Sequence, residues 1–95
     1  MADAVHVALL KSLASCLMFL EHSPDDIVDL DSAVKAMESA AYELLKLSDT
    51  DRAALVALIQ EVAESESHEF DRRFLLSMPF AVGLVEDGPT FDKPA

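Results

Sequence analysis

Apolar residues recur at helical spacing in four successive segments of this chain, and no other feature constrains its fold as strongly. We expect helices over approximately residues 3–21, 32–46, 49–63 and 66–77. Strand signals are nearly absent, because no alternating Val, Ile or Thr run lies between turn residues. Since the connections are short, the sequence predicts an all-α fold: a small antiparallel helical bundle of three long helices plus one short helix, with an irregular C-terminal tail.

Polar residues mark where these helices begin. The motif Ser23-Pro24-Asp25-Asp26 is typical of a helix start, and the single turn that it opens should end at about Asp29. Asp31 or Ser32 is then expected to cap the second long helix. The motif Ser48-Asp49-Thr50-Asp51 has the spacing of a capping box and predicts the start of the third.

The centres of the apolar stripes predict the core. Six residues are expected there: Leu13, Leu17, Leu44, Leu58, Ile59 and Phe74. Cys16 lies among leucines and should also be a small core residue. Leu10, Met18 and Phe19 widen the apolar surface of the first helix beyond one stripe. This helix should therefore be central to the fold or form a homodimer.

The C-terminal part holds a second apolar segment. Pro79 should end the fourth helix, because proline lacks the N–H that the helix interior requires. Residues 78–85 are then expected to pack within the chain rather than against a partner, since exposed patches of that size are uncommon on monomers. Gly88 and Pro89 mark the start of a tail. We expect one helical domain over residues 1–87 and a flexible tail over 88–95.

The single cysteine and the apolar N-terminal segment indicate the cellular compartment of the protein. One thiol cannot form an intramolecular disulfide, which favours a reducing compartment. The apolar stretch from Val5 to Leu20 is interrupted by polar residues, is shorter than the about 20 residues of a membrane span, and follows Asp3 where a signal peptide has positive charge. We therefore expect a soluble, cytoplasmic protein with no membrane segment.

Charge restricts the partners. The chain has 18 acidic and 7 basic residues, for a net charge of −11. Nucleic acids and anionic membranes bind through Lys and Arg, so neither is an expected partner. A basic protein surface would be attracted to this chain, whereas solubility alone is the other explanation of the acidic excess.

No set of residues indicates catalysis or metal binding. His6, His22 and His68 fall on different segments, and none has a second ligand at motif spacing. The acidic stretch from Asp25 to Asp31 lacks the glycine and the terminal glutamate of a calcium-binding loop. We therefore expect no enzyme activity, no metal and no cofactor.

Two acidic clusters are the candidate partner-binding sites. The first lies in the first interhelical connection and the second at the junction of the third and fourth helices. Their members are Asp25, Asp26, Asp29 and Asp31, and then Glu64, Glu66, Glu69 and Asp71. Such clusters steer a basic partner, and the simpler alternative is a solvated face.

Asp31-Ser32 at a helix start resembles the phosphopantetheine attachment point of acyl carrier proteins. In that family the serine opens an acidic recognition helix, and the resemblance implies modification at Ser32. Ala33 stands where the family has leucine, and no glycine precedes Asp31. An Asp-Ser helix cap accounts for the same residues without a cofactor, so the carrier function is the alternative.

As a whole, the chain resembles small acidic helical immunity proteins that neutralise bacterial toxins. The resemblance is one of size, charge, helical pattern and the lack of a catalytic set. It implies a non-enzymatic protein that forms a tight, occluding complex with a basic toxin or effector domain. A homodimeric helical scaffold or regulatory adaptor is a further alternative.

Overall fold

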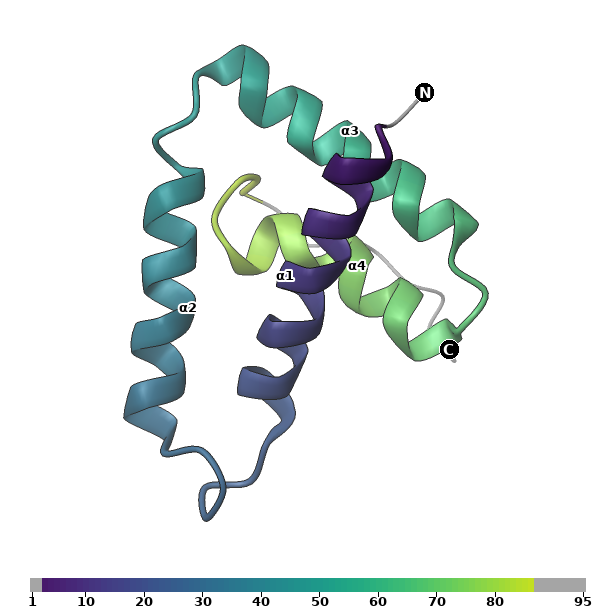
Figure 1. The fold of residues 1–95 in the computed structure, drawn as a ribbon. Helices are drawn as coiled ribbons and strands as arrows, with labels where there is room; N and C mark the ends of the chain where they lie inside the picture. Colours follow the sequence, from purple (N-terminus) through teal and green to yellow (C-terminus); the bar gives the residue numbers. More distant parts are fainter. Residues whose placement is uncertain (1–2, 87–95) are drawn as a thin grey trace, which may run out of the picture.

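The structure, a computed structural model, describes residues 3–86 and contains four helices in that range. They are α1 (Ala4–His22), α2 (Leu30–Leu44), α3 (Asp49–Ser65) and α4 (Glu69–Ala81). No strand occurs among these residues, and the all-α prediction is confirmed for them. Helices α1 and α2 form one hairpin, α3 and α4 form a second that crosses it, and α2 packs chiefly on α1 (Figure 1). The tail expected over 88–95 lies outside the described residues.

Helices α1, α2 and α3 begin at side-chain caps, one of which differs from the expectation, whereas α4 has no side-chain capping hydrogen bond. Ser48 accepts a hydrogen bond from the Asp51 N–H at 3.1 Å, as predicted for α3. For α2, however, the cap is Asp29 rather than Asp31 or Ser32. The Asp29 carboxylate accepts from both the N–H and the hydroxyl of Ser32, at 3.1 and 3.2 Å. The helix therefore begins at Leu30, two residues earlier than expected.

The connection between α1 and α2 contains the expected single turn. The N–H groups of Ile27 and Val28 both donate to the Pro24 carbonyl. Ser23, however, does not cap this turn, because its hydroxyl donates to the Phe19 carbonyl. It closes the end of α1 instead.

The prediction that Pro79 ends the fourth helix is wrong. Pro79 lies inside α4, and the helix ends two residues later. Gly83 closes the helix, and its φ of 81° lies in the left-handed region that suits glycine. The Gly83 N–H donates to the Phe80 carbonyl, and the Leu84 N–H donates to the Pro79 carbonyl at 2.7 Å. This is the Schellman arrangement. Burial of Pro79 with Met78 offsets the one hydrogen bond that the proline removes.

The core lies where α1 crosses the second hairpin. Its buried members come from α1, α3, α4 and the residue that follows α4: Leu10, Ala14, Leu17, Ile59, Val62, Ala63, Phe74, Leu75, Met78 and Val82. Of the six predicted core residues, Leu17, Ile59 and Phe74 are buried, and the other three are half-buried at the edge. The expected packing of residues 78–85 within the chain is found in part: Met78, Pro79 and Val82 are buried and Leu84 is half-buried, whereas Phe80 and Val85 are exposed.

Helix α1 buries much less of its surface than its sequence suggests. Leu10, Ala14 and Leu17 are its only buried residues. Cys16 is exposed, so the prediction of a core thiol is wrong: successive residues of a helix point about 100° apart, and Leu17 faces the core. With 19 residues, α1 is also long and apolar enough to cross a membrane, contrary to our length argument. Core helices and signal sequences meet the same criterion.

Candidate functional site

The first acidic cluster lies on the connection between α1 and α2, at one end of that hairpin (Figure 1). We call residues 23–31 the acidic connection. Asp25, Asp26, Asp29 and Asp31 are all exposed. None of the four takes part in an ion pair with another described residue. Asp29 serves the α2 cap, which leaves three carboxylates without a structural role in this part of the chain.

Two large apolar side chains lie among these acidic residues. Ile27 is 65% exposed and Leu30 is 62% exposed. Ile27 follows Asp26 directly, and Leu30 lies between Asp29 and Asp31. The acidic connection thus combines exposed apolar side chains with surrounding negative charge, which is how the anchors and rim of a protein interface are composed.

The second acidic cluster is engaged within the chain. Glu69 forms ion pairs with Arg72 at 2.7 Å and Arg73 at 2.9 Å. Hydrogen bonds from Arg72 and then Arg73 hold the pKa of the Glu69 carboxyl below its usual range. Asp71 lies 3.5 Å from the His68 Nδ1. Two arginines therefore offset part of the negative charge here.

The remaining members of that cluster differ. Glu66 accepts a hydrogen bond from the His68 N–H at 3.1 Å, which orders the connection between α3 and α4. Glu64 is exposed near the end of α3. The two predicted clusters are thus separate surfaces on different connections. Among the described residues, no carboxylate of the first cluster forms an ion pair; in the second cluster Glu69 forms two, whereas Glu64 and Glu66 form none.

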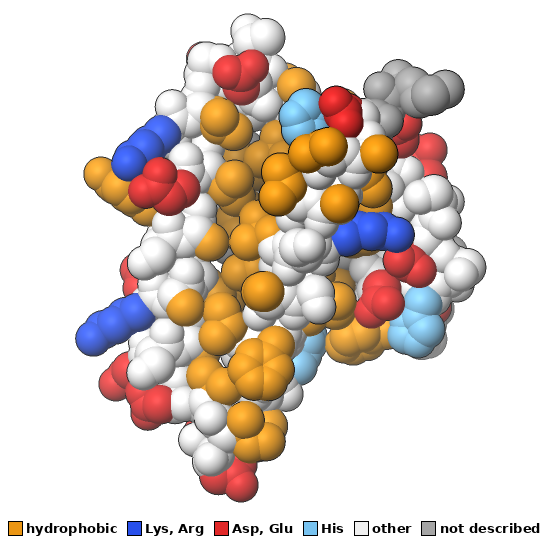
Figure 2. Space-filling view, in the orientation of Figure 1, with side chains coloured by type: hydrophobic (Ala, Val, Ile, Leu, Met, Phe, Trp, Pro, Cys, Tyr) orange, Lys and Arg blue, Asp and Glu red, His pale blue; other side chains and the backbone are white. Residues whose placement is uncertain are grey.

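An apolar surface follows the line where α1 meets α2. A space-filling view shows hydrophobic side chains lying side by side along this line (Figure 2). They surround a cavity of about 220 Å³ lined by His6, Leu9, Leu10, Leu13, Leu44, Leu55 and Leu58. We call these residues the apolar seam. Leu9 is 63% exposed although α1 is a core helix. The sequence signal for the seam was the breadth of apolar surface on the first helix.

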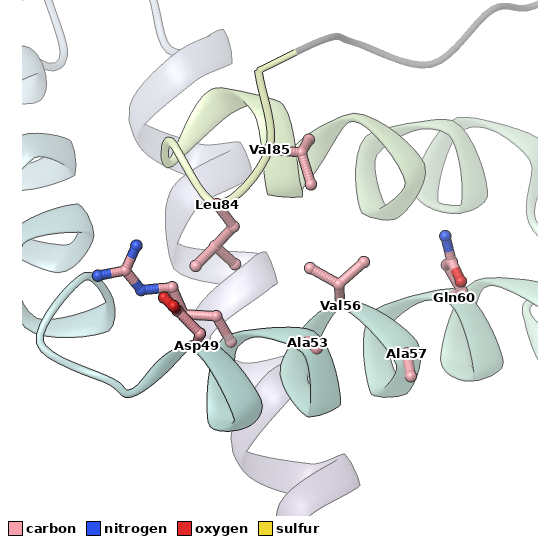
Figure 3. Close-up of a pocket in the computed structure, with 8 residues that line it drawn as sticks. Asp49, Ala53, Val56, Ala57, Gln60, Leu84 and Val85 are labelled. Atoms are coloured by element: carbon pink, nitrogen blue, oxygen red, sulfur yellow. The ribbon is translucent and has the colours of Figure 1, made fainter.

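A larger hollow of about 460 Å³ lies between α3 and the turn after α4. Val56 of α3 faces Leu84 and Val85 across it (Figure 3). Arg52 also lines it, but its guanidinium donates to the Leu45 carbonyl at 2.6 Å and to the Leu47 carbonyl at 3.0 Å. This arginine therefore closes the end of α2.

The histidines occupy unrelated positions. His6 lines the apolar seam, and the His22 ring lies 5.1 Å from that of Phe70. His68 directly precedes α4, and its side chain makes no capping hydrogen bond. Among residues 3–86, no group of three His, Cys, Asp or Glu side chains is placed to hold a metal. Ser32 is exposed, and its hydroxyl donates to Asp29.

No protein-family model, curated protein or solved structure matches the chain.

Proposed function

We propose that this chain acts by binding rather than catalysis, as an immunity protein that neutralises a basic bacterial toxin through an occluding complex. The proposal places this interaction in the cytoplasm. The observation that carries it is the acidic connection, where Ile27 and Leu30 stand exposed among carboxylates that have no cation nearby in the described part of the chain.

Each component has a distinct physical role in this proposal. The carboxylates of Asp25 and Asp26 attract a basic surface and raise the rate of encounter. Ile27 and Leu30 then lose their remaining exposure to water, which slows dissociation. The arrangement supports the first acidic cluster over the second, because Arg72 and Arg73 already offset the charge of Glu69.

The test needs a toxin-like open reading frame beside the gene for this chain, and its product is then the toxin candidate. Co-expression should restore the growth of cells that the candidate kills. Reversing two charges with Asp25→Lys and Asp26→Lys should slow association by about tenfold at low salt, with dissociation little changed. The effect should shrink as salt rises, because exposed charges are screened beyond about 8–10 Å. Asp29 is left intact because it caps α2.

A matched pair of substitutions separates local from overall charge. Glu61→Lys and Glu64→Lys change the net charge by the same amount on the exposed surface of α3. Their effect on association should be markedly smaller. Equal effects of the two pairs would assign attraction to net charge alone and remove the acidic connection as the binding site.

A further inference from the structure

The apolar seam is a surface that the proposed function does not by itself explain. Leu9 and Val5, one helical turn apart on α1, are 63% and 62% exposed. Cys16 lies two turns further along the same face and is also exposed. The cavity between the helices has almost only leucine on its walls. Exposed apolar surface in a continuous line is characteristic of a surface that binds another molecule.

The shape of the seam fits a helix. Its residues come from α1, the end of α2 and α3, and the apolar surface that contains it continues along the line where α1 meets α2 (Figure 2). These two antiparallel helices of 19 and 15 residues correspond to lengths of about 28 and 22 Å. A third helix with one apolar face would complete this hairpin as helices do in small bundles. Such a helix would place apolar residues at i, i+3, i+4 and i+7 against Leu9 and its neighbours.

The distribution of charge defines the chemistry of that helix. The lysines nearest the seam in sequence point to other surfaces: Lys11 lines a hollow with Glu66 and Asp71, and Lys35 lines one with Tyr42. Lys46 lies 4.7 Å over the Tyr42 ring.

Acidic residues, by contrast, lie beyond both ends of the hairpin. The acidic connection joins α1 to α2 at one end, and Asp49 and Asp51 open α3 after the other (Figures 1 and 2). A helix with lysines or arginines beside its apolar face would be attracted by carboxylates at both ends of the hairpin. A second copy of this chain would bring another −11 charges to the same surface, which opposes pairing of the two seams.

We infer that the apolar seam docks a basic amphipathic helix of the partner, with the partner's apolar face on Leu9 and Leu13 and its cations toward the acidic ends. This inference rests on the proposed function and specifies the partner's recognition element.

The test uses a synthetic peptide of about 18 residues made of Leu and Lys, with Leu at helical spacing, which is about 27 Å long as a helix. Two further peptides serve as controls: one has the same composition in scrambled order, and the other has Glu in place of Lys. Binding to the full chain is measured by fluorescence anisotropy. Alkylation of Cys16, the only cysteine, by iodoacetamide reports whether the seam is covered.

We expect the Leu/Lys peptide to bind at least about tenfold more tightly than either control and to slow alkylation of Cys16 severalfold. Leu9→Gln should weaken that binding by about tenfold, whereas Tyr42→Gln should leave it unchanged. Tyr42 is the matched control because it is 65% exposed and lies beside Lys35 and Lys46, away from the seam. Both variants should keep the wild-type circular dichroism spectrum and melting curve.

Four results would overturn the inference. Equal binding of the scrambled peptide would mean attraction by charge alone. Equal effects of Leu9→Gln and Tyr42→Gln, or unchanged alkylation, would place binding elsewhere. A dimer in sedimentation that Leu9→Gln dissociates would assign the seam to a second copy. The seam and the proposed function can fail separately. If the peptide does not bind but Asp25→Lys and Asp26→Lys still slow toxin association, the proposed function stands without the seam. If the peptide binds but the chain does not neutralise the toxin, the seam stands without the proposed function.

Discussion

Replacing two leucines of α1 separately by alanine tests the structure most directly. Leu17 is 2% exposed and Leu9 is 63% exposed, although both occupy the same helix and lose the same atoms. Because the change in intrinsic helix propensity is the same at both positions, it cancels in the comparison. The difference between the two free energies of unfolding therefore reports burial.

The expected magnitudes follow from that exposure. Leu17→Ala removes buried carbon and leaves a cavity, which should cost about 3 kcal/mol within the usual range of ~2–5 kcal/mol. Leu9→Ala removes atoms that are already mostly in water and should cost less than about 1 kcal/mol. For a domain of this size, the difference corresponds to roughly 10–15 °C in melting temperature.

Urea and thermal unfolding followed by far-ultraviolet circular dichroism measure both variants. The urea m-values should match that of the wild type, so that shifts in midpoint report stability. Losses of equal size at the two positions would refute the assignment of the buried face of α1. If the loss at Leu9 depends on protein concentration, the seam is covered by a second copy, because only association makes stability depend on concentration.

Three further predictions concern a helix cap, a helix end and an ion pair. Asp29→Ala should lower the free energy of unfolding by about 1 kcal/mol, because α2 loses its cap, and Asp31→Ala should cost clearly less; equal losses in urea titrations would contradict the cap assignment. Gly83→Ala should cost about 1–2 kcal/mol because a φ of 81° strains any residue with a Cβ, and an unchanged melting temperature would argue against this helix end. Paired arginines lower the pKa of Glu69, so any stability from these pairs is present near neutral pH and is lost as the pH falls below about 4. The melting difference between wild type and Glu69→Gln should therefore disappear in acid; a difference that persists there would not arise from ionisation.

Local sequence predicted the helices well but chose between neighbouring caps poorly. Before α3, the capping-box spacing between Ser48 and Asp51 predicts Ser48 as the cap, and the structure confirms it. Before α2, Asp29, Asp31 and Ser32 all satisfy the residue preference for a cap. Which of them is used depends on where the turn that follows Pro24 ends, and residue preference does not contain that information.

Tertiary contacts decided the fourth helix. Pro79 is a helix-breaking residue by local rules, yet it is buried within α4, which continues until Gly83 supplies a left-handed end. The glycine was visible in the sequence and was the better signal for the helix end. The free-energy cost of a proline inside a helix is visible in the local sequence, whereas the burial that offsets this cost depends on tertiary packing.

Part of the candidate site could be predicted from the sequence, and part of it depends on tertiary contacts. Both acidic clusters could be found from the sequence, and the spacing of Glu69 to Arg72 and Arg73 also predicts the ion pairs that distinguish the second cluster. The apolar seam could not be found in this way. Leu9 and Leu17 belong to the same broad apolar surface, and only the place where α3 and α4 cross α1 decides which of them is buried.

The exposed leucines and the acidic excess are physically connected. An apolar line along α1 would favour pairing of two copies in a neutral protein, because each pair of seams would remove leucine from water. A charge of −11 on each copy opposes that approach, and carboxylates beyond both ends of the hairpin place the repulsion near the seam. The same carboxylates attract a cationic helix. Solubility alone would require the charge but not the exposed leucines, and a monomer without a partner would gain stability by burying them. The two features together therefore favour a surface kept apart from its own copies and available to a basic partner.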